Sequence, residues 1–265
     1  MLLDAGSLAL DYFKKTKQTI KKDGSIVTEA DIAVEKFLRD KLSSKNSVWI
    51  GEESSERLSE IELEETFKGV GFIVDPIDGT MNYANGLEMW GISVGFLKNG
   101  ELIDGVVYFP CINEIFITRG DKVHFLSLDH KEIKSDIILD SCHDDDEAFG
   151  KKILSVTQAM AKNEIVKYPG PIHSISSAVY TICKLITGSY YGYIGKLKIW
   201  DLAAVYPMCQ RLGYEVVFTN GKHLNSKIDK NQYILELNSK TRYSAIDRLI
   251  FCPQNHSKKL IDQLF

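Results

Sequence analysis

Asp75 and Asp78 are the two residues whose type and spacing first indicate chemistry. Asp75 follows the apolar run Phe72–Val74, which is typical of a short buried strand. Pro76 fixes its own φ angle and removes a backbone donor, so the turn between the two acids is stiff. Two carboxylates on a stiff turn can face one point, and converging oxygen atoms suit a hard cation such as Mg²⁺.

Gly79 and Thr80 follow the second acid and predict the start of a helix. Their backbone N–H groups would lie at the helix N-terminus, where an anion such as phosphate is favoured. The same residues also make an ordinary turn with Asp78 as the helix cap, so the motif alone leaves a structural and a catalytic interpretation open. The spacing excludes an aspartyl-phosphate mechanism, because two residues separate the acids where Asp-x-Asp has one.

Two further acids stand at the ends of predicted elements. Asp31 completes a capping-box pattern that begins at Thr28, at the start of a helix expected over residues 26–41. It either caps this helix or handles a proton or a water molecule. Glu52 comes directly after a short strand predicted at 48–50, as Asp75 does after its own strand.

Polar residues also open two helices predicted in the second half of the chain. Ser176 and Ser177 begin a helix expected to reach residue 186, and Asp201 begins one expected to reach residue 212. The serines are either caps or a surface for a ligand, and Asp201 is a natural N-cap or a further site residue. The basic run at residues 14–22 is typical of a solvated face.

The composition is that of an ordinary globular protein of 265 residues, with 44% hydrophobic and 26% charged residues. The net charge of −4 gives no support to nucleic-acid binding. We expect no membrane partner, because no stretch approaches the roughly 20 apolar residues that span a bilayer. Five scattered cysteines without a Cys-x-x-Cys pair predict reduced thiols in a cytoplasmic protein.

The elements predict a meander followed by alternating strands and helices. Strands at 91–97 and 102–108, joined at Asn99-Gly100, are followed by strands at 114–118 and 123–128. Residues 137–139 could add another. The second half predicts a helix at 148–161 and strands at 165–168, 190–194 and 215–218, with a terminal helix at 257–265. The chain is one domain or two close halves, an α+β half at 1–140 and an α/β half at 141–265.

Taken together and in this order, these motifs resemble the inositol monophosphatase family. The resemblance rests on residues 27–31, 51–54, 75–82 and 200–204, and it covers nearly the whole chain. It implies a layered αβαβα sandwich and a Mg²⁺-dependent phosphatase, often dimeric and often inhibited by lithium. The family includes phosphatases of inositol phosphates, bisphosphate nucleotides, fructose bisphosphate and histidinol phosphate.

The resemblance also implies a role for each acid. Five positions match the family's ligands for a cluster of Mg²⁺ ions: Glu52, Asp75, the carbonyl oxygen of Ile77, Asp78 and Asp201. Thr80 and Asp31 match the pair that activates the attacking water, and the backbone of Gly79 and Thr80 matches the part that receives the phosphate. The all-oxygen ligand set suits Mg²⁺ rather than Zn²⁺.

The substrate is less clearly indicated. The acid that contacts sugar hydroxyls in inositol-specific members would stand seven residues before Asp201, where this chain has Ile194. Lys196 and Lys198 nearby could meet a second phosphate or a carboxylate, or could be surface lysines. Met81-Asn82-Tyr83 resembles the inositol-phosphatase branch more than the nucleotide branch. The alternatives are a bisphosphate nucleotidase, a histidinol-phosphatase and, outside enzymes, a regulatory binding protein that keeps the fold.

Overall fold

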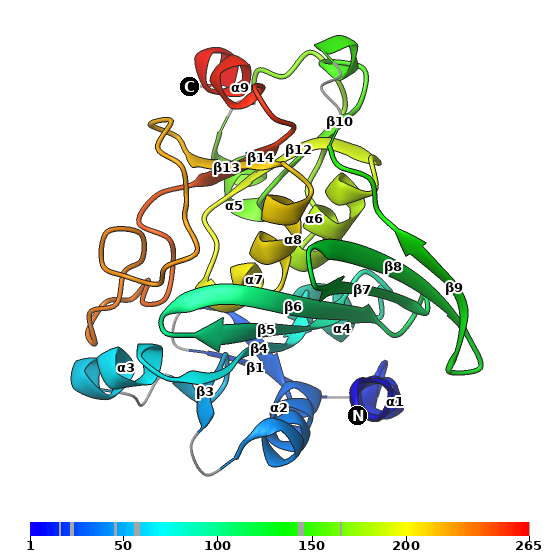
Figure 1. Ribbon diagram of the computed structural model, residues 1–265. Coiled ribbons are helices and arrows are strands. Elements are labelled where there is room, and N and C mark those ends of the chain that lie inside the picture. Colours follow the sequence, from blue (N-terminus) through cyan, green and yellow to red (C-terminus); the bar gives the residue numbers. More distant parts are fainter. Residues whose placement is uncertain are drawn as a thin grey trace.

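The computed structural model describes residues 1–15, 17–21, 24–44, 47–55, 59–142, 146–164 and 166–264 (Figure 1). Within them, a seven-stranded sheet has the order β3-β4-β5-β6-β7-β8-β9. Only β3 and β4 pair in parallel; each later neighbour pairs antiparallel, so the predicted meander is confirmed. Its strands are β3 (Ser47–Gly51), β4 (Val70–Asp78), β5 (Gly91–Lys98), β6 (Glu101–Phe109), β7 (Glu114–Arg119), β8 (Lys122–Asp129) and β9 (Glu132–Ile138).

A second, five-stranded sheet has the order β11-β10-β12-β14-β13. Its strands are β10 (Ile153–Val156), β11 (Ile172–His173), β12 (Tyr190–Gly195), β13 (Glu215–Phe218) and β14 (Leu249–Cys252). β10 pairs in parallel with β11 and β12, whereas β14 runs antiparallel to both of its neighbours. The sheet is therefore mixed.

The helices form three layers around these two sheets, which confirms the predicted αβαβα sandwich. α1 (Leu2–Tyr12) and α2 (Glu29–Leu42) cover the outer face of the seven-stranded sheet. α6 (Ala178–Ile186), α7 (Ile199–Ala203) and α8 (Val205–Arg211) lie between the sheets (Figure 1). The third layer packs on the far side of the second sheet, where Met160 and Leu260 share a cluster with Leu154. The remaining helices are α3 (Glu60–Phe67), α4 (Thr80–Ala84), α5 (Gln158–Asn163) and α9 (Ser257–Leu264).

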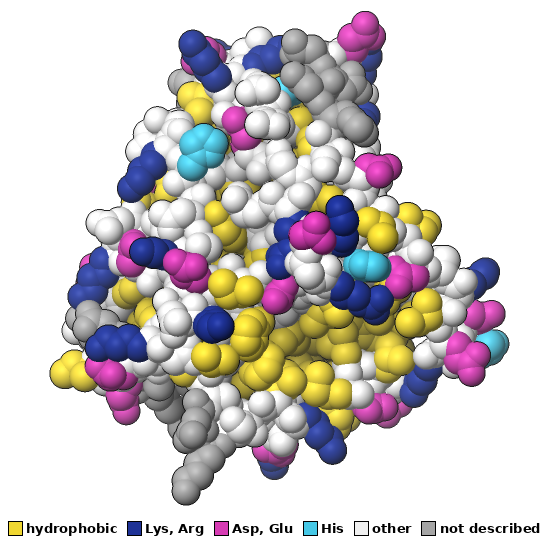
Figure 2. All heavy atoms as spheres, viewed as in Figure 1, with side chains coloured by type: hydrophobic (Ala, Val, Ile, Leu, Met, Phe, Trp, Pro, Cys, Tyr) yellow, Lys and Arg dark blue, Asp and Glu magenta, His cyan; other side chains and the backbone are white. Residues whose placement is uncertain are grey.

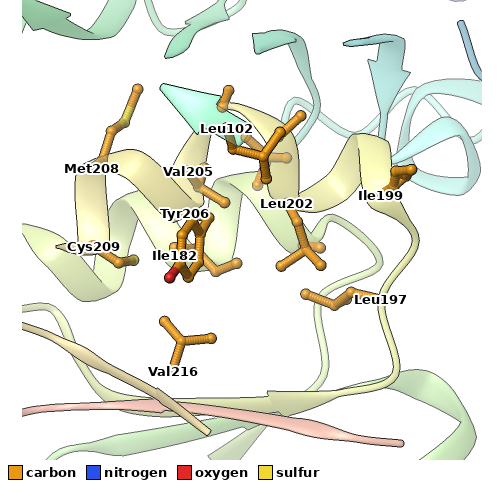
Figure 3. Packing of buried hydrophobic residues seen from close by; sticks show 14 of the residues in the cluster. Leu102, Ile182, Leu197, Ile199, Leu202, Val205, Tyr206, Met208, Cys209 and Val216 are labelled. Carbon is orange, nitrogen blue, oxygen red and sulfur yellow. The ribbon is translucent and has the colours of Figure 1, made fainter. Parts of the chain in front are cut away.

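The largest buried cluster fills the space between the two sheets. Figure 3 shows Leu202 and Val205 of the middle helices between Leu102 of one sheet and Val216 of the other. The cluster contains residues of both halves of the chain, and the division at residue 140 stays a prediction.

Two glycines let the middle helices approach the seven-stranded sheet closely. A Cβ at Gly95 would lie 2.4 Å from the Cβ of Ala203, and one at Gly105 would lie 2.2 Å from the carbonyl oxygen of Ala204. The glycines therefore fix the depth at which α7 and α8 sit on β5 and β6.

The helix predicted to begin at Asp201 is in fact two helices, and it starts earlier. Lys198 is the N-cap of α7, so Asp201 occupies the third position of its first turn, and the prediction of Asp201 as N-cap was wrong. The chain breaks at Ala204 and continues as α8, in which Pro207 stands in the first turn. Proline lacks the N–H that would continue the hydrogen bonds of α7, so the break has a local cause.

Two other predicted elements of the second half were also wrong. The helix expected at 148–161 is strand β10 followed by the short helix α5, because a short buried apolar run fits either structure. Of the strand expected at 165–168, residue 165 lies outside the described residues and the rest is not a strand. Tyr168 instead packs its ring against Phe149 and Tyr191.

The surface seen in Figure 2 is hydrophobic where the seven-stranded sheet extends past α1. Leu3, Val106 and Ile117 are half-buried against a small cluster that includes Leu126. Among the described residues, we find no helix with both the length and the apolar character that crossing a membrane requires.

Candidate active site

A bulge at the end of β4 brings Asp75 and Asp78 to the same side of the strand. Asp75 is opposite Ser93 and Asp78 is opposite Gly91, so β4 has one residue more than β5 between these two pairs. In a regular strand, residues three apart point to opposite faces, and the extra residue removes that alternation. Within the bulge, the N–H of Ile77 donates to Asp75 Oδ1 at 3.1 Å.

Asp201, which is half-buried, completes a group of three aspartates, of which Asp75 and Asp78 are buried. One carboxylate oxygen of each of Asp75, Asp78 and Asp201 lies within 4.8 Å of the others. α7 supplies the third acid, Asp201, and the Oδ2 atom of Asp201 accepts a hydrogen bond from the N–H of Lys198 at 2.7 Å. Residues from β4 and from a helix more than 120 positions later are thus assembled at one point.

Burial and mutual repulsion raise the pKa of these carboxyls. Burial is the main cause in each case, and the neighbouring acids add to it. The pKa of Asp78 rises to about 6 and that of Asp201 to about 8, while the pKa of Asp75 rises well above its ordinary range. Negative charge is therefore costly at this point unless a cation shares it.

The N-terminus of α6 supports Asp78. The carboxylate of Asp78 accepts hydrogen bonds from the hydroxyl of Ser177 and from the N–H groups of Ala178 at 3.2 Å and Val179 at 3.1 Å. Ser177 is also the N-cap of α6, since its hydroxyl accepts the N–H of Tyr180. These donors and the positive end of the helix favour the ionised carboxylate and hold it in one orientation.

Asp31 and Thr80 form a hydrogen-bonded pair beside the aspartates. Asp31 does cap α2: its Oδ2 accepts the N–H of Thr28 at 2.8 Å and the Thr28 hydroxyl at 2.6 Å. Its other oxygen faces the Thr80 hydroxyl at 3.2 Å, and that hydroxyl also lies 3.0 Å from the carbonyl oxygen of Ile77. Burial is the main cause that raises the pKa of Asp31 to about 6. The structural and the catalytic interpretations are therefore compatible.

Gly79 begins α4 in a conformation that suits glycine. Its φ is 90°, and a Cβ there would lie 2.9 Å from the Cβ of Ser177 and 3.0 Å from the carbonyl oxygen of Met89. A side chain would therefore be strained and would also push the α6 N-terminus away.

Glu52 and Glu53 form a second acidic group, which is paired with Lys21. The Lys21 ammonium lies 3.3 Å from Glu52 Oε1 and 2.7 Å from Glu53 Oε1. Behind them, the buried carboxylate of Glu35 accepts the N–H of Glu53 at 2.8 Å. A Cβ at Gly51 would lie 2.3 Å from that carboxylate, so a larger residue there would have to displace the Glu35 side chain.

The aspartates open into a cleft of about 370 Å³. Ser25 and Ile26 line one side, Thr157 and Gln158 another, and Lys196 is the one cationic residue among the described residues of the lining. The cleft is lined by Ser25, Ile26, Glu52, Asp75, Ile77, Asp78, Gly79, Thr80, Met81, Thr157, Gln158, Ala159, Ile175, Ser176, Ser177, Ala178, Tyr193, Lys196, Leu197 and Asp201.

The structure thus brings together every candidate site residue named from the sequence, with Asp31 just behind the lining. Ile194 is fully buried in the cluster that contains Leu154 and Met160, on the far side of the second sheet. Its neighbour Tyr193 lines the cleft instead. Sequence reasoning missed Glu35 and Tyr193, and it placed Lys21 on a solvated face although its side chain is only 15% exposed. The signal that could have shown a hairpin after Lys21 is a glycine three residues later, since Gly24 has φ 85°.

A sequence profile of the inositol monophosphatase family matches residues 2–256. The chain belongs to the inositol monophosphatase family. It is a phosphatase, a hydrolase of phosphoric monoesters. The fold agrees, since the Thermotoga maritima IMPase superposes with a TM-score of 0.70 at 19% identity, over 98% of this chain and 92% of that one. Inositol monophosphatase II of Staphylococcus aureus gives a TM-score of 0.72 at 19% identity, over 99% and 92%.

Relatives within the family carry several different names. A histidinol-phosphatase of Chlorobaculum parvum is 34% identical over 116 residues, which is 42% of each chain. A Nus factor SuhB of Pasteurella multocida is 27% identical over 77% of this chain and 76% of its own. A fructose-1,6-bisphosphatase/inositol-1-monophosphatase of Thermotoga maritima is 24% identical over 85% of each chain. Sequence similarity alone therefore leaves the substrate open.

Proposed function

We propose that this protein is a Mg²⁺-dependent phosphomonoesterase that hydrolyses a small phosphorylated metabolite, of the inositol monophosphate-like polyol or sugar phosphate class. The observation that carries the proposal is the convergence of Asp75, Asp78 and Asp201 in a cleft beside the Asp31–Thr80 pair. The geometry supports a site that holds cations, phosphate and a water molecule at the same point.

The donors fit Mg²⁺. Carboxylates and a backbone carbonyl are the hard oxygen ligands that this ion prefers, and histidine and cysteine are absent from the described lining of the cleft. Asp75, Asp78, Asp201, Glu52 and the Ile77 carbonyl would hold the ions. Bound Mg²⁺ would lower the pKa of water and stabilise the charge on phosphoryl and leaving oxygen atoms.

Thr80 and Asp31 would accept the proton of the attacking water. The Thr80 hydroxyl carries a single proton and faces both Asp31 and the Ile77 carbonyl. When it donates to Asp31, its lone pairs point outward and can accept from a water molecule. With a pKa of about 6, Asp31 is mostly ionised at neutral pH and suits this task. The products are inorganic phosphate and the free alcohol, without a phosphoenzyme.

The phosphate would lie against the start of α4, where Gly79 and Thr80 leave backbone N–H groups without helical partners. Ser176 lines the same cleft. Ser177 stays a candidate for substrate binding, although in this structure its hydroxyl is directed to Asp78.

A second substrate class has a specific observation in its favour. Lys196 stands at the cleft, and Ile194, at the position expected for a polyol-binding acid, is buried elsewhere. A cation in this wall favours a substrate that carries a second anionic group, such as a 3′(2′),5′-bisphosphate nucleotide. Histidinol phosphate, the substrate named for one relative, is the other alternative.

Phosphate release tests the proposal. Inositol 1-phosphate, adenosine 3′,5′-bisphosphate, fructose 1,6-bisphosphate, histidinol phosphate and glycerol 2-phosphate are compared with and without Mg²⁺. We expect release that requires Mg²⁺, is inhibited by lithium, and falls by roughly 10³-fold in Asp78→Asn. Asp104→Asn, which alters a surface aspartate paired with Arg211, should behave as the wild type does. Equal turnover by the Asp78 variant would refute the metal assignment.

The non-enzymatic alternative is a regulatory binding protein, and its support is the Nus factor name of two relatives. Strong partner capture together with silence across the substrate panel would favour it. The proposed enzyme acts in the cytoplasm, in keeping with five cysteines that form no disulfide, and as a homodimer. Light scattering of the purified protein tests the dimer.

A further inference from the structure

We propose that Lys21 is a built-in cation of the acidic site, which occupies a position at Glu52 that a divalent ion would otherwise take and so limits how many ions the site binds. The inference rests on the proposed function, because it concerns the same metal cluster. Lys21 takes no part in the proposed proton transfer or in phosphate binding.

Lys21 forms ion pairs with two glutamates that are largely shielded from solvent. Its ammonium bridges Glu52 at 3.3 Å and Glu53 at 2.7 Å, and the side chains of all three residues are between 12% and 15% exposed. The single ammonium in contact with both carboxylates balances one of their two charges.

The position of Lys21 is fixed by the same segment that carries Asp31. Lys21 follows β1 (Gln18–Ile20), which pairs antiparallel with β2 (Ile26–Thr28). The N–H of Lys21 donates to the carbonyl of Ser25 at 2.8 Å, and β2 leads directly into Thr28, the cap of α2. Ser25 and Ile26 line the cleft, so the hairpin that holds Lys21 is also a wall of the site.

Glu52 differs from the aspartates in what surrounds it. The carboxylates of Asp75, Asp78 and Asp201 converge on one another, whereas Glu52 lies outside that group and contacts the ammonium. An ammonium and a divalent cation that contact the same carboxylate repel each other, so each weakens the binding of the other there. Any ion that uses Glu52 must share it with Lys21 or displace Lys21.

Metal titration tests this role without reference to turnover. Mn²⁺ binding is measured by calorimetry on the wild type and on Lys21→Met, with the thermal shift on adding Mn²⁺ as a second readout. We expect Lys21→Met to bind its weakest ion about fivefold more tightly or to bind one ion more, because two glutamates are left without their counter-ion. Its melting temperature should fall without metal and recover with it.

Three further variants test whether the positive charge of Lys21, at its own position, causes the change in Mn²⁺ binding. Lys21→Arg keeps the charge and should bind Mn²⁺ as the wild type does. Lys151→Met removes an equal charge at a lysine that is 70% exposed, and should change nothing. Glu53→Gln leaves Lys21 with Glu52 alone and should weaken the weakest Mn²⁺ site, the opposite sign to Lys21→Met.

A folded Lys21→Met protein that binds Mn²⁺ no more tightly than the wild type would overturn the inference. If Lys21→Met fails to fold, the sign of the Glu53→Gln effect decides. Absence of Mn²⁺ binding in the wild type would refute the proposed metal site itself, which is a different result from an unchanged affinity in the variants.

Discussion

Two acidic groups lie side by side in this molecule, and their charge is balanced in different ways. Asp75, Asp78 and Asp201 are held by neutral donors: backbone N–H groups and the hydroxyl of Ser177. Glu52 and Glu53 are closed around the ammonium of Lys21. Neutral donors orient a carboxylate but leave its net charge in place, whereas an ammonium cancels one charge.

The difference indicates where a metal ion is most needed. Asp75, Asp78 and the half-buried Asp201 repel one another, and a divalent ion would relieve this repulsion. The glutamate pair is already half neutralised by Lys21, so a metal ion would relieve less repulsion there.

Asp201→Asn should separate the two groups most clearly. The amide keeps an oxygen that can accept the N–H of Lys198, so the fold should persist. It removes one of three convergent charges, and we expect phosphatase activity to fall by roughly 10²–10⁴-fold. Glu53→Gln should cost less than about tenfold, because Glu53 contacts Lys21 and not the aspartates. Steady-state kinetics at saturating Mg²⁺ measure both, and comparable losses would contradict the division into two groups.

The metal-free protein should lose stability as the pH rises from about 5 to about 8. Folding raises the pKa of Asp201 to about 8 and that of Asp78 to about 6, chiefly through burial, so both carboxyls of the folded protein titrate in this pH range. The folded state then binds more protons than the unfolded state, so the free energy of unfolding falls with increasing pH, by on the order of 1–3 kcal/mol. Mg²⁺ binds the deprotonated carboxylates and should therefore stabilise the protein more at pH 8 than at pH 6.

Thermal unfolding in EDTA and in Mg²⁺ across this pH range measures both slopes. Asp201→Asn removes a carboxyl whose pKa is raised to about 8, so the metal-free stability of this variant should depend less on pH than that of the wild type. A wild-type protein whose metal-free stability rises over the same range would show that the aspartates are not the groups that titrate.

Much of the candidate site could be predicted from the sequence, because its residues lie at the ends of short local elements. Asp75 and Asp78 lie in the last residues of β4, Gly79 follows it directly, and Pro76 stands in the bulge between the acids. Asp31 could be assigned as a helix cap from four consecutive residues. The meander was predictable for the same reason, since hairpins join strands that are neighbours in sequence.

The second sheet could not be predicted as well, because its order depends on partners far apart in the chain. The strand β14 was not predicted, yet it lies between β12 and β13 and pairs with both of them. β10 is a short apolar run whose identity as a strand is decided by its neighbours β11 and β12. Glu35 was not foreseen either, because its contact is with the backbone of Glu53, eighteen residues later.

Glu35→Ala should loosen the glutamate group while leaving the aspartates in place. The N–H of Glu53 would lose its acceptor, which costs about 1–3 kcal/mol when the donor stays buried. We expect a lower melting temperature and a several-fold higher Mg²⁺ requirement, with kcat at saturating Mg²⁺ little changed. Glu35→Gln keeps an acceptor oxygen and should restore most of both. The same Mg²⁺ dependence in the alanine and glutamine variants would mean that Glu35 has only a packing role.

Gly51→Ala sharpens the same test. Its Cβ would meet the Glu35 carboxylate at 2.3 Å, so the single variant should be destabilised by roughly 1–3 kcal/mol. Adding Glu35→Ala makes room, and the double variant should be less destabilised than the sum of the two single variants. Strict additivity would show that the two residues do not meet in solution.

Lys196→Gln should give the smallest effect, and one that depends on the substrate. Lys196 is exposed at the cleft, so its attraction for an anionic group is screened and worth at most about 1 kcal/mol, or a factor of about five in KM. We expect KM to rise for a bisphosphate and to stay unchanged for glycerol 2-phosphate, which has no second anionic group. The difference should shrink at high salt, because exposed charges are screened there. An equal rise in KM for both compounds would place Lys196 at the phosphate that is cleaved, and would remove the reason to favour a substrate with two anionic groups.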